Sequence, residues 1–414
     1  MSLKIDQTPN LLRTKRYVLY WISSLFSNIG TWMQQVAQPW VILNLTHSAF
    51  WVGMDSFVMN APGWIFTLWG GVLADRFDRK KIVLWCQSIQ FFFVFILLVL
   101  LVLGKIQIWI ILVSSFFIGV TDSLSMPAFQ SIIPSIVDQK DVPRAVALNS
   151  IQFNLSRILG PAVAGMVIAA YGASVCYGAN LISFIPFFLS LYWIYPRSTG
   201  KKTDGAFSVR PTGNQFKQIL GNRDYQIPLM TIFVTTLFCS PLITFCPVIV
   251  KEVFHGEAHD LGWSMMSVGI GGVLGGIVSS LLGGKISSSQ TYTNVIAALL
   301  GMSLVLLIFI PTILLFDFLI VFAGAALTMS NTASNANLQK TAHNDIRGQV
   351  MSLFQTALHG GMSIGSLFAG LMISHFGVRV ALFANGLTAA VFQFGILYFY
   401  RRRINLKPSD RPLD

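Results

Sequence analysis

Residues 71–81 of the chain read Gly-Val-Leu-Ala-Asp-Arg-Phe-Asp-Arg-Lys-Lys, and they lie between two long apolar segments. The last seven of these residues include six charged side chains, a density that no other interval between apolar segments reaches. Charge of this density between two apolar helices indicates a tight loop at the cytoplasmic face of a membrane. The stretch therefore predicts an integral membrane protein in which two helices meet at residues 75–81.

The overall composition agrees with a membrane protein. Of the 414 residues, 54% are hydrophobic and 11% are charged, whereas charged residues make up about a quarter of a soluble protein. Because a helix needs roughly 20 apolar residues to cross a bilayer, we expect an all-α membrane protein with twelve transmembrane helices. The windows are 18–43, 49–74, 82–104, 107–127, 146–170, 174–195, 226–250, 260–284, 291–310, 314–337, 349–374 and 378–400.

The distribution of basic residues explains the net charge of +12. If the N-terminus is cytoplasmic and all windows span, all but four of the 28 basic residues face the cytoplasm. The exceptions are Lys105, Lys251 and Arg379 outside, and Arg157 within a helix. This asymmetry follows the positive-inside rule, so both termini are expected in the cytoplasm and no nucleic-acid partner is indicated.

A hydrophilic interval after the sixth window divides the chain in two. We expect a cytoplasmic N-terminal segment, a first six-helix bundle, a cytoplasmic linker, a second six-helix bundle and a basic cytoplasmic tail. Their bounds are 1–16, 17–195, 196–225, 226–400 and 401–414.

The two halves share a pattern at a shift of 205 residues. Six residues of the first half recur in the second. Gly160, Ala164-Gly165, Gly172 and Ala179-Asn180 correspond to Gly365, Ala369-Gly370, Gly377 and Ala384-Asn385. Parallel repeats about an axis along the membrane normal are one architecture of secondary transporters. The repeat thus supports two pseudo-equivalent bundles.

Residues 71–81 resemble the loop signature G-x-L-A-D-R/K-x-G-R/K-R/K of the major facilitator superfamily of transporters, except that Asp78 stands where the family usually has Gly. Several stretches are also similar to the branch that contains bacterial multidrug and macrolide efflux proteins and the enterobactin siderophore exporter. They are residues 70–79, 126–130, 147–150, 157–161, 348–352 and 365–370.

The resemblance implies that the loop is one side of a latch that closes the cytoplasmic end, formed by Gly71, Asp75, Arg76, Arg79 and Lys80. The alternative is that the loop only sets the topology. Asp78 in place of Gly would remove an easy positive-φ position, and it could compete with Asp75 for one arginine. The matching place in the second half, residues 283–285, keeps two glycines and one base without the acid, so any latch is asymmetric.

Ionisable groups inside a span cost roughly 2.5–3.5 kcal/mol on insertion scales, so each needs a reason. A protonatable carboxylate facing a water-filled cavity suits an antiporter, and Asp55 is a candidate; a solvated acid at the outer rim is the alternative. Asp122 and Arg157 could meet between adjacent antiparallel helices, either as a proton-sensitive switch that frees Arg157 for an anionic substrate or as a fixed ion pair. His359 could titrate near neutral pH or remain a neutral, satisfied imidazole. Asp317 is expected at the outer interface.

Amides and hydroxyls within the spans are candidates for a substrate site, although some of them will serve as hydrogen-bonding glue between helices. On the first span, i, i+3/i+4 spacing puts four of them on one face. The candidates are Asn28, Thr31, Gln35, Gln38, Asn149, Gln152, Asn331, Asn335 and Gln355. Gly160 and Pro161 resemble the element that bends the fifth helix of antiporters and seals it against proton leak, and Pro161 lacks a backbone donor, so a kink is expected there.

The expected function is export of a small amphipathic molecule, a siderophore or a drug-like compound, by proton antiport and alternating access. Lysophospholipid transport and a non-transporting receptor or scaffold are the alternatives. No catalytic motif indicates an enzyme, and the four cysteines have no metal-ligand spacing. We therefore expect no metal and no cofactor, the proton gradient as driving force, a small-molecule substrate and the lipid bilayer as partners, a monomer, and a multi-pass location in the bacterial inner membrane.

Overall fold

The computed structural model describes residues 15–193, 219–282, 289–343 and 346–405, and these ranges are helical with short connections and without a strand. They contain ten helices that are long and apolar enough to cross a membrane. These ten candidate spans correspond to α4 (Arg79–Val102), α5 (Ile108–Ile136), α6 (Val142–Tyr171), α7 (Ala173–Trp193), α9 (Arg223–Cys239), α12 (Ala258–Leu281), α14 (Gln290–Leu306), α15 (Ile313–Thr341), α16 (Arg347–Phe376) and α17 (Val378–Asn405).

Two of the expected spans have a different character. Helix α1 (Lys15–Thr46) is long enough, but its amides lower its hydropathy below that of the ten. The second expected span is divided into α2 (Ala49–Asn60) and α3 (Pro62–Arg76). Pro62 has no backbone N–H to donate to the preceding turn, so it begins a new helix.

Proline also divides the segment that follows α9. Helix α10 (Pro241–Thr244) and helix α11 (Cys246–Val248) each have a proline in the first turn, and a π-helical turn, η3 (Ile249–Val253), follows them. Short 3₁₀ turns, η2 (Gln139–Asp141) and η4 (Leu307–Phe309), precede α6 and follow α14.

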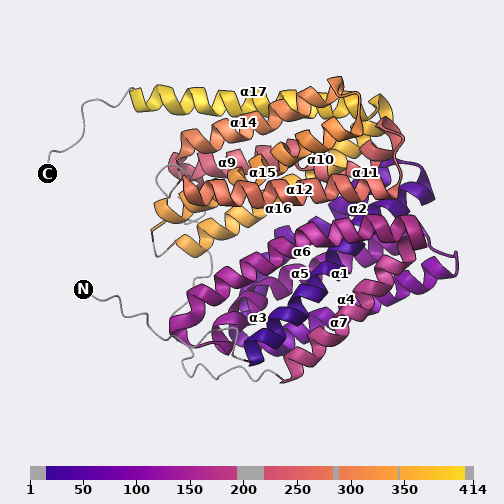
Figure 1. Cartoon of the computed structure of the whole chain (residues 1–414). Coiled ribbons are helices and arrows are strands. Elements are labelled where there is room, and N and C mark those ends of the chain that lie inside the picture. Colours follow the sequence, from indigo (N-terminus) through magenta and orange to yellow (C-terminus); the bar gives the residue numbers. More distant parts are fainter. Residues whose placement is uncertain (1–14, 194–218, 283–288, 344–345, 406–414) are drawn as a thin grey trace, which may run out of the picture.

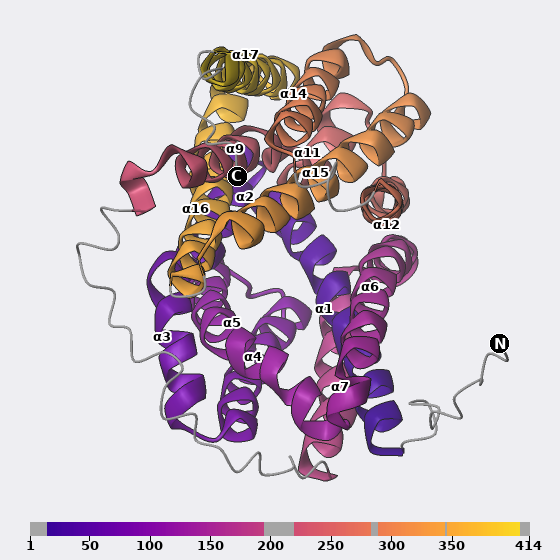
Figure 2. The same ribbon diagram turned by 90° about the vertical axis from the view of Figure 1, so that its left-hand side faces the viewer.

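The helices form two bundles, which we name the N-half (α1 to α7) and the C-half (α9 to α17) (Figure 1). Figure 2 shows α1, α5, α15 and α16 arranged around the centre of the molecule, with α12 and α6 side by side at one edge. The largest buried apolar cluster contains residues of both halves, among them Ile42, Val52, Phe245 and Leu261.

The internal repeat appears in the helices. Helix α16 begins and ends 205 residues after α6, and α17 begins 205 residues after α7. The glycines between them, Gly172 and Gly377, end their helices with φ of 85° and 81°. Because non-glycine residues rarely adopt positive φ, the same turn is encoded twice.

Candidate functional site

The halves meet through small residues at one end of the molecule, the end opposite to the start of α1. A Cβ placed on Gly53 of α2 would lie 2.4 Å from the carbonyl oxygen of Ser366 on α16. Ser56 donates a hydrogen bond to the Ser366 hydroxyl at 3.0 Å, and the Ser363 hydroxyl donates to the carbonyl oxygen of Phe57 at 3.0 Å. We name this the α2–α16 contact.

A second close approach joins α6 and α12. A Cβ on Gly165 would lie 2.4 Å from the Cα of Gly262, and a Cβ on Gly262 would lie 2.6 Å from the Cα of Gly165. Gly269 packs in the same way on the backbone of Arg157, which a Cβ would approach to 2.9 Å. We name this the α6–α12 contact; its small residues let the two backbones touch.

Arg157 lies where the α6–α12 contact ends, near the middle of α6. Its guanidinium is 5.9 Å from the ring centroid of Trp32 on α1. A Cβ on Gly272 of α12 would lie 3.2 Å from a guanidinium nitrogen of Arg157 and 3.2 Å from the hydroxyl of Thr328 on α15. The side chain thus extends from the N-half onto the C-half, and it remains partly exposed.

Asp55 is buried inside the N-half, at 5% exposure. Its carboxylate accepts hydrogen bonds from the Gln38 amide at 2.9 and 3.1 Å and from the Ser115 hydroxyl at 2.5 Å. The network continues from Gln38 through Gln34 to Asn180, whose amide donates to Gln34 at 2.6 Å. The outer-rim alternative for Asp55 is therefore wrong, because the carboxylate is enclosed by α1, α2 and α5.

The expected meeting of Asp122 and Arg157 is wrong for this structure. The Asp122 carboxylate instead accepts a hydrogen bond from the Gln90 amide of α4 at 2.7 Å. In the described part of the chain Arg157 has no hydrogen bond and no ion pair. A neutral amide on α4 is the partner of the acid, so the two charges are held apart.

His359 lies on α16 at the interface between the halves. Its Nδ1 is 3.4 Å from the Asn60 side-chain oxygen at the end of α2, and a Cβ on Gly63 would lie 3.0 Å from the imidazole ring. Asp317 accepts a hydrogen bond from Ser264 near the start of α15.

The substrate-binding candidates fall into two groups. Gln38 and Gln152 are buried, at 6% and 1% exposure: Gln38 binds Asp55, and Gln152 contacts Ser156. Their part in a substrate site stays a prediction. The others keep some exposure on α1, α6, α15 and α16, the helices that also include Arg157 and His359; they are Asn28, Thr31, Gln35, Asn149, Asn331, Asn335 and Gln355.

The charged loop is described only in part. The side chains of Gly71, Asp75 and Arg76 lie outside the described residues, as do residues 283–285 of the second half. Asp78 has a φ of −61° and is the N-cap of α4, where its carboxylate accepts a hydrogen bond from the Lys80 backbone at 2.9 Å. The backbone here does not need a positive φ, and the position serves as a helix cap, which Asp provides well. Arg79 is exposed, and the Lys80 ammonium donates to the carbonyl oxygen of Tyr192 at 3.2 Å.

The kink elements lie within the continuous helix α6. A Cβ on Gly160 would lie 2.4 Å from the Cβ of Trp32, so this glycine allows α1 and α6 to touch. Pro161 is buried beside it. The bend itself stays a prediction.

Several partners were missed from the sequence. Gln90 binds Asp122 and Ser115 binds Asp55, and Trp32 and Thr328 flank Arg157. Gln90 precedes the run Phe-Phe-Phe-Val-Phe, and an amide at such a place is a signal that could have been used. Ser115 and Thr328 had none, since hydroxyls are frequent within transmembrane helices.

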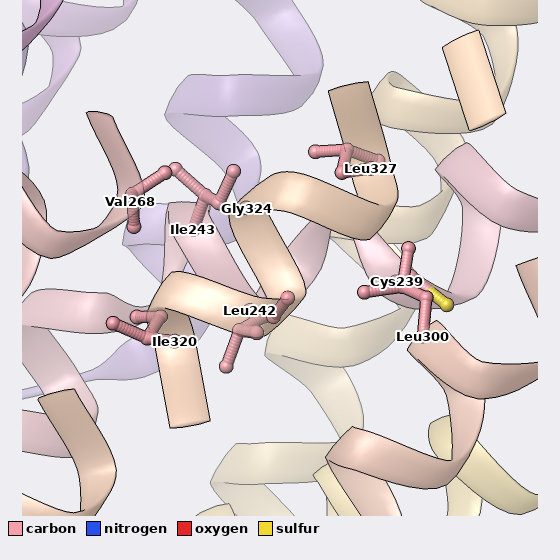
Figure 3. Close-up of a pocket in the computed structure, with 9 residues that line it drawn as sticks. Cys239, Leu242, Ile243, Val268, Leu300, Ile320, Gly324 and Leu327 are labelled. Carbon is pink, nitrogen blue, oxygen red and sulfur yellow. The ribbon is translucent and has the colours of Figure 1, made fainter. Parts of the chain in front are cut away.

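Two apolar cavities lie in the described part. One, of about 10 Å³, is enclosed within the C-half by Cys239, Leu242, Ile320 and their neighbours (Figure 3). It has room for about one water molecule at most, so it is not a substrate site. The other, of about 300 Å³, lies between α3, α9 and α16 and is lined by residues that include Trp64, Phe233 and Leu353.

Comparison with known proteins agrees with this fold. The staphyloferrin A transporter of Staphylococcus aureus is 24% identical over 394 residues, covering 94% of this chain and 98% of that protein. Macrolide efflux protein A of Streptococcus pyogenes is 20% identical over 369 residues, covering 88% and 91%. The crystal structure of a bacterial homolog of the human lysosomal transporter Spinster, inward-facing and unoccupied, has a TM-score of 0.76 at 13% identity and covers 98% of this chain and 100% of its own.

The transmembrane secretion effector family, a family of major facilitator transporters, matches residues 8–410. These are transporters and not enzymes, and the chain, like its bacterial relatives, is a multi-pass protein of the inner membrane. The prediction made from residues 71–81 is confirmed: the chain belongs to the transmembrane secretion effector family of the major facilitator superfamily.

Proposed function

We propose that the chain exports a small amphipathic molecule, a siderophore or a drug-like compound, from the cytoplasm by alternating access and proton antiport. The observation that carries the proposal is that the side-chain contacts between the halves in the described residues run from one end of the molecule to about mid-depth. A contact made of glycines and hydroxyls can separate without exposing a large apolar surface. The relatives that act on staphyloferrin A and on macrolides support a secreted small molecule.

The topology that we propose has twelve spans and cytoplasmic termini. It counts α1 as one span, α2 with α3 as one, and the ten apolar helices as the rest. With this orientation the basic residues follow the positive-inside rule. The bundles are 17–195 and 226–400, with segments 1–16, 196–225 and 401–414 in the cytoplasm. The end where the halves meet is then the outer end.

For coupling, we favour Asp55 and Asp122 as the proton carriers. Both are carboxylates inside spans, and each is bound by neutral donors only, Asp55 by Gln38 and Ser115 and Asp122 by Gln90. Neutral donors do not fix the charged form of a carboxylate as an arginine would, so either group can exchange a proton during the cycle. His359, at the moving interface, is a third candidate.

For the cytoplasmic end, the loop of Gly71, Asp75, Arg76, Arg79 and Lys80 would close as a latch in the outward-facing state. Exposed Arg79 at the start of α4 is consistent with a loop whose partner is distant in this state. For the substrate, the 300 Å³ cavity beside Trp64 would take an apolar portion, because pockets for drug-sized ligands have volumes from about 300 Å³ upward and mostly apolar walls.

The experiment is transport into inside-out proteoliposomes with an acidic interior, using staphyloferrin A and the macrolide erythromycin as probes. Proton antiport predicts ATP-independent uptake that stops when a protonophore collapses the pH gradient. Uptake that persists after collapse would contradict the antiport. If neither probe is taken up, nor a lysophospholipid included as a third probe, the proposal of export fails. Empty liposomes are the control.

A further inference from the structure

Arg157 is a cation without an anion. The three acids that the sequence places inside spans each have a neutral partner: Asp55 has Gln38, Asp122 has Gln90 and Asp317 has Ser264. No carboxylate of the described chain therefore neutralises Arg157. An ionised side chain at this depth is costly, and such residues commonly mark a substrate or ion pathway.

The surroundings of Arg157 hold the guanidinium but leave its donors open. The guanidinium lies over the Trp32 ring, 5.9 Å from its centroid, and Trp32 makes a T-shaped contact with Phe153, one helical turn before Arg157 on α6. A cation–π contact stabilises the charge by about 0.5–2 kcal/mol but accepts none of the five N–H groups. The side chain is partly exposed, so these donors can reach a ligand.

The position of Arg157 joins both halves. Gly272 of α12 leaves the space in which the guanidinium lies, and the hydroxyl of Thr328 on α15 adjoins the same space. Arg157, Gly272 and Thr328 are near the middle of their helices. A ligand bound by this arginine would thus contact the N-half and the C-half at mid-depth, where transporters of this architecture hold their substrates.

We propose that Arg157 and Thr328 form the binding site for an anionic group, a carboxylate or a phosphate, of the transported molecule. The proposal rests on the proposed function and narrows its substrate class to amphipathic anions. The Trp32 ring stabilises the charge of the guanidinium without accepting its N–H groups, so these can donate two parallel hydrogen bonds to a carboxylate. Gly272 leaves room for this arrangement, since a Cβ there would come within 3.2 Å of both the guanidinium and the Thr328 hydroxyl.

The test compares free acids with their esters. Purified full-length protein in detergent is titrated with rhodamine B, which has a free carboxylate, and with rhodamine B ethyl ester, and binding is followed by fluorescence anisotropy. Citrate and trimethyl citrate form a second pair, measured by thermal stabilisation. We expect the wild type to prefer the free acid of at least one pair by roughly tenfold or more, as expected for one charge-assisted hydrogen bond.

Three variants assign the preference to Arg157. Arg157→Gln should bind acid and ester equally, and Arg157→Lys should retain part of the preference. Arg144→Gln, which removes an exposed arginine from the same helix, should match the wild type. A preference that survives in Arg157→Gln, or a wild type that distinguishes neither pair, would overturn the proposal. A structural role alone would lower stability in Arg157→Gln without changing the ratio between acid and ester.

Two further experiments distinguish the possible sources of the anion and separate the anion site from the proposed transport function. In nanodiscs, competition with rhodamine B by phosphatidylglycerol but not by phosphatidylcholine would identify a lipid phosphate as the anion; without competition, the class is a soluble carboxylate. Proteoliposome flux of rhodamine B ethyl ester, unchanged in Arg157→Gln, would show that transport stands even if the anion site fails. Selective binding of the free acid without flux of any probe would show that the anion site stands even if the proposed transport fails.

Discussion

The hydrogen-bond partners of Asp55 are neutral groups, as a proton carrier requires. Gln38 and Ser115 donate to the carboxylate inside the N-half, away from any basic side chain of the described chain. Asn at this position keeps the shape but can neither take up nor release a proton. We expect Asp55→Asn to lose pH-gradient-driven accumulation by about tenfold or more, while downhill flux of the same probe persists.

The matched control for this change is Asp317→Asn, which neutralises another carboxylate near the start of α15, bound by Ser264 of α12. It should retain gradient-driven accumulation in the same proteoliposomes. Loss of a hydrogen bond at Asp55 also costs about 1–3 kcal/mol, so thermal unfolding is measured for both variants. If Asp55→Asn accumulates the probe as the wild type does, Asp55 is not the carrier.

At the same scale, the sequence identified the charged residues but not their partners. Asp122 and Arg157 both lie within helices as expected, yet the expected pair does not occur, because the rotation of α5 and α6 about their axes is not encoded by spacing alone. The Gln90 amide donates a hydrogen bond to the Asp122 carboxylate, where an arginine partner was expected. Likewise Gln38 was placed on the cavity face by its spacing, but a carboxylate on the next helix attracts its amide inward.

At the scale of elements, helix α12 has glycines at the contact between the halves and another glycine that faces no neighbouring atom. Gly262 touches Gly165 across the halves, whereas a Cβ on Gly276 would meet nothing within 4 Å. Gly262→Leu should therefore prevent closure of the outer end, since the nearest atoms are backbone and cannot move aside. Overpacking costs about 1–3 kcal/mol, enough to shift a conformational equilibrium roughly five-fold to 150-fold.

Labelling from outside measures this shift. A cysteine at Ser366, in the α2–α16 contact, should react faster with an impermeant maleimide in Gly262→Leu than in the parent, and transport should fall. Gly276→Leu, on the same helix, should leave both unchanged. Equal behaviour of the two leucine variants would argue that the α6–α12 contact has no part in closure.

Element boundaries followed the sequence where apolar runs were uninterrupted and departed from it at prolines. The window 146–170 matches α6 (Val142–Tyr171), and 349–374 matches α16. The window 49–74 did not show the division before Pro62, because hydropathy averages over a break that removes a backbone donor. The same holds for Pro241 and Pro247 after α9.

For the whole molecule, the two-bundle fold could be predicted because the repeat and the charge asymmetry are global patterns, and α6 and α16 reproduce the shift of 205 residues. The end of the molecule at which the halves meet could not be predicted from the sequence. States of a transporter differ by a few kcal/mol, and Gly53, Ser56 and Ser366 are small residues that suit a contact when closed and cost little when separated.

If the α2–α16 contact must open in each cycle, locking it should stop transport. The hydroxyls of Ser56 and Ser366 are 3.0 Å apart, so Ser56→Cys with Ser366→Cys should form a disulfide under copper phenanthroline. The four native cysteines are buried and should react little. We expect oxidation to reduce proteoliposome transport at least tenfold and dithiothreitol to restore it. Ser56→Cys with Ser374→Cys, an exposed position further along α16, should neither cross-link nor lose activity. Full transport by the cross-linked protein would mean that substrate leaves by a route that does not separate the halves here.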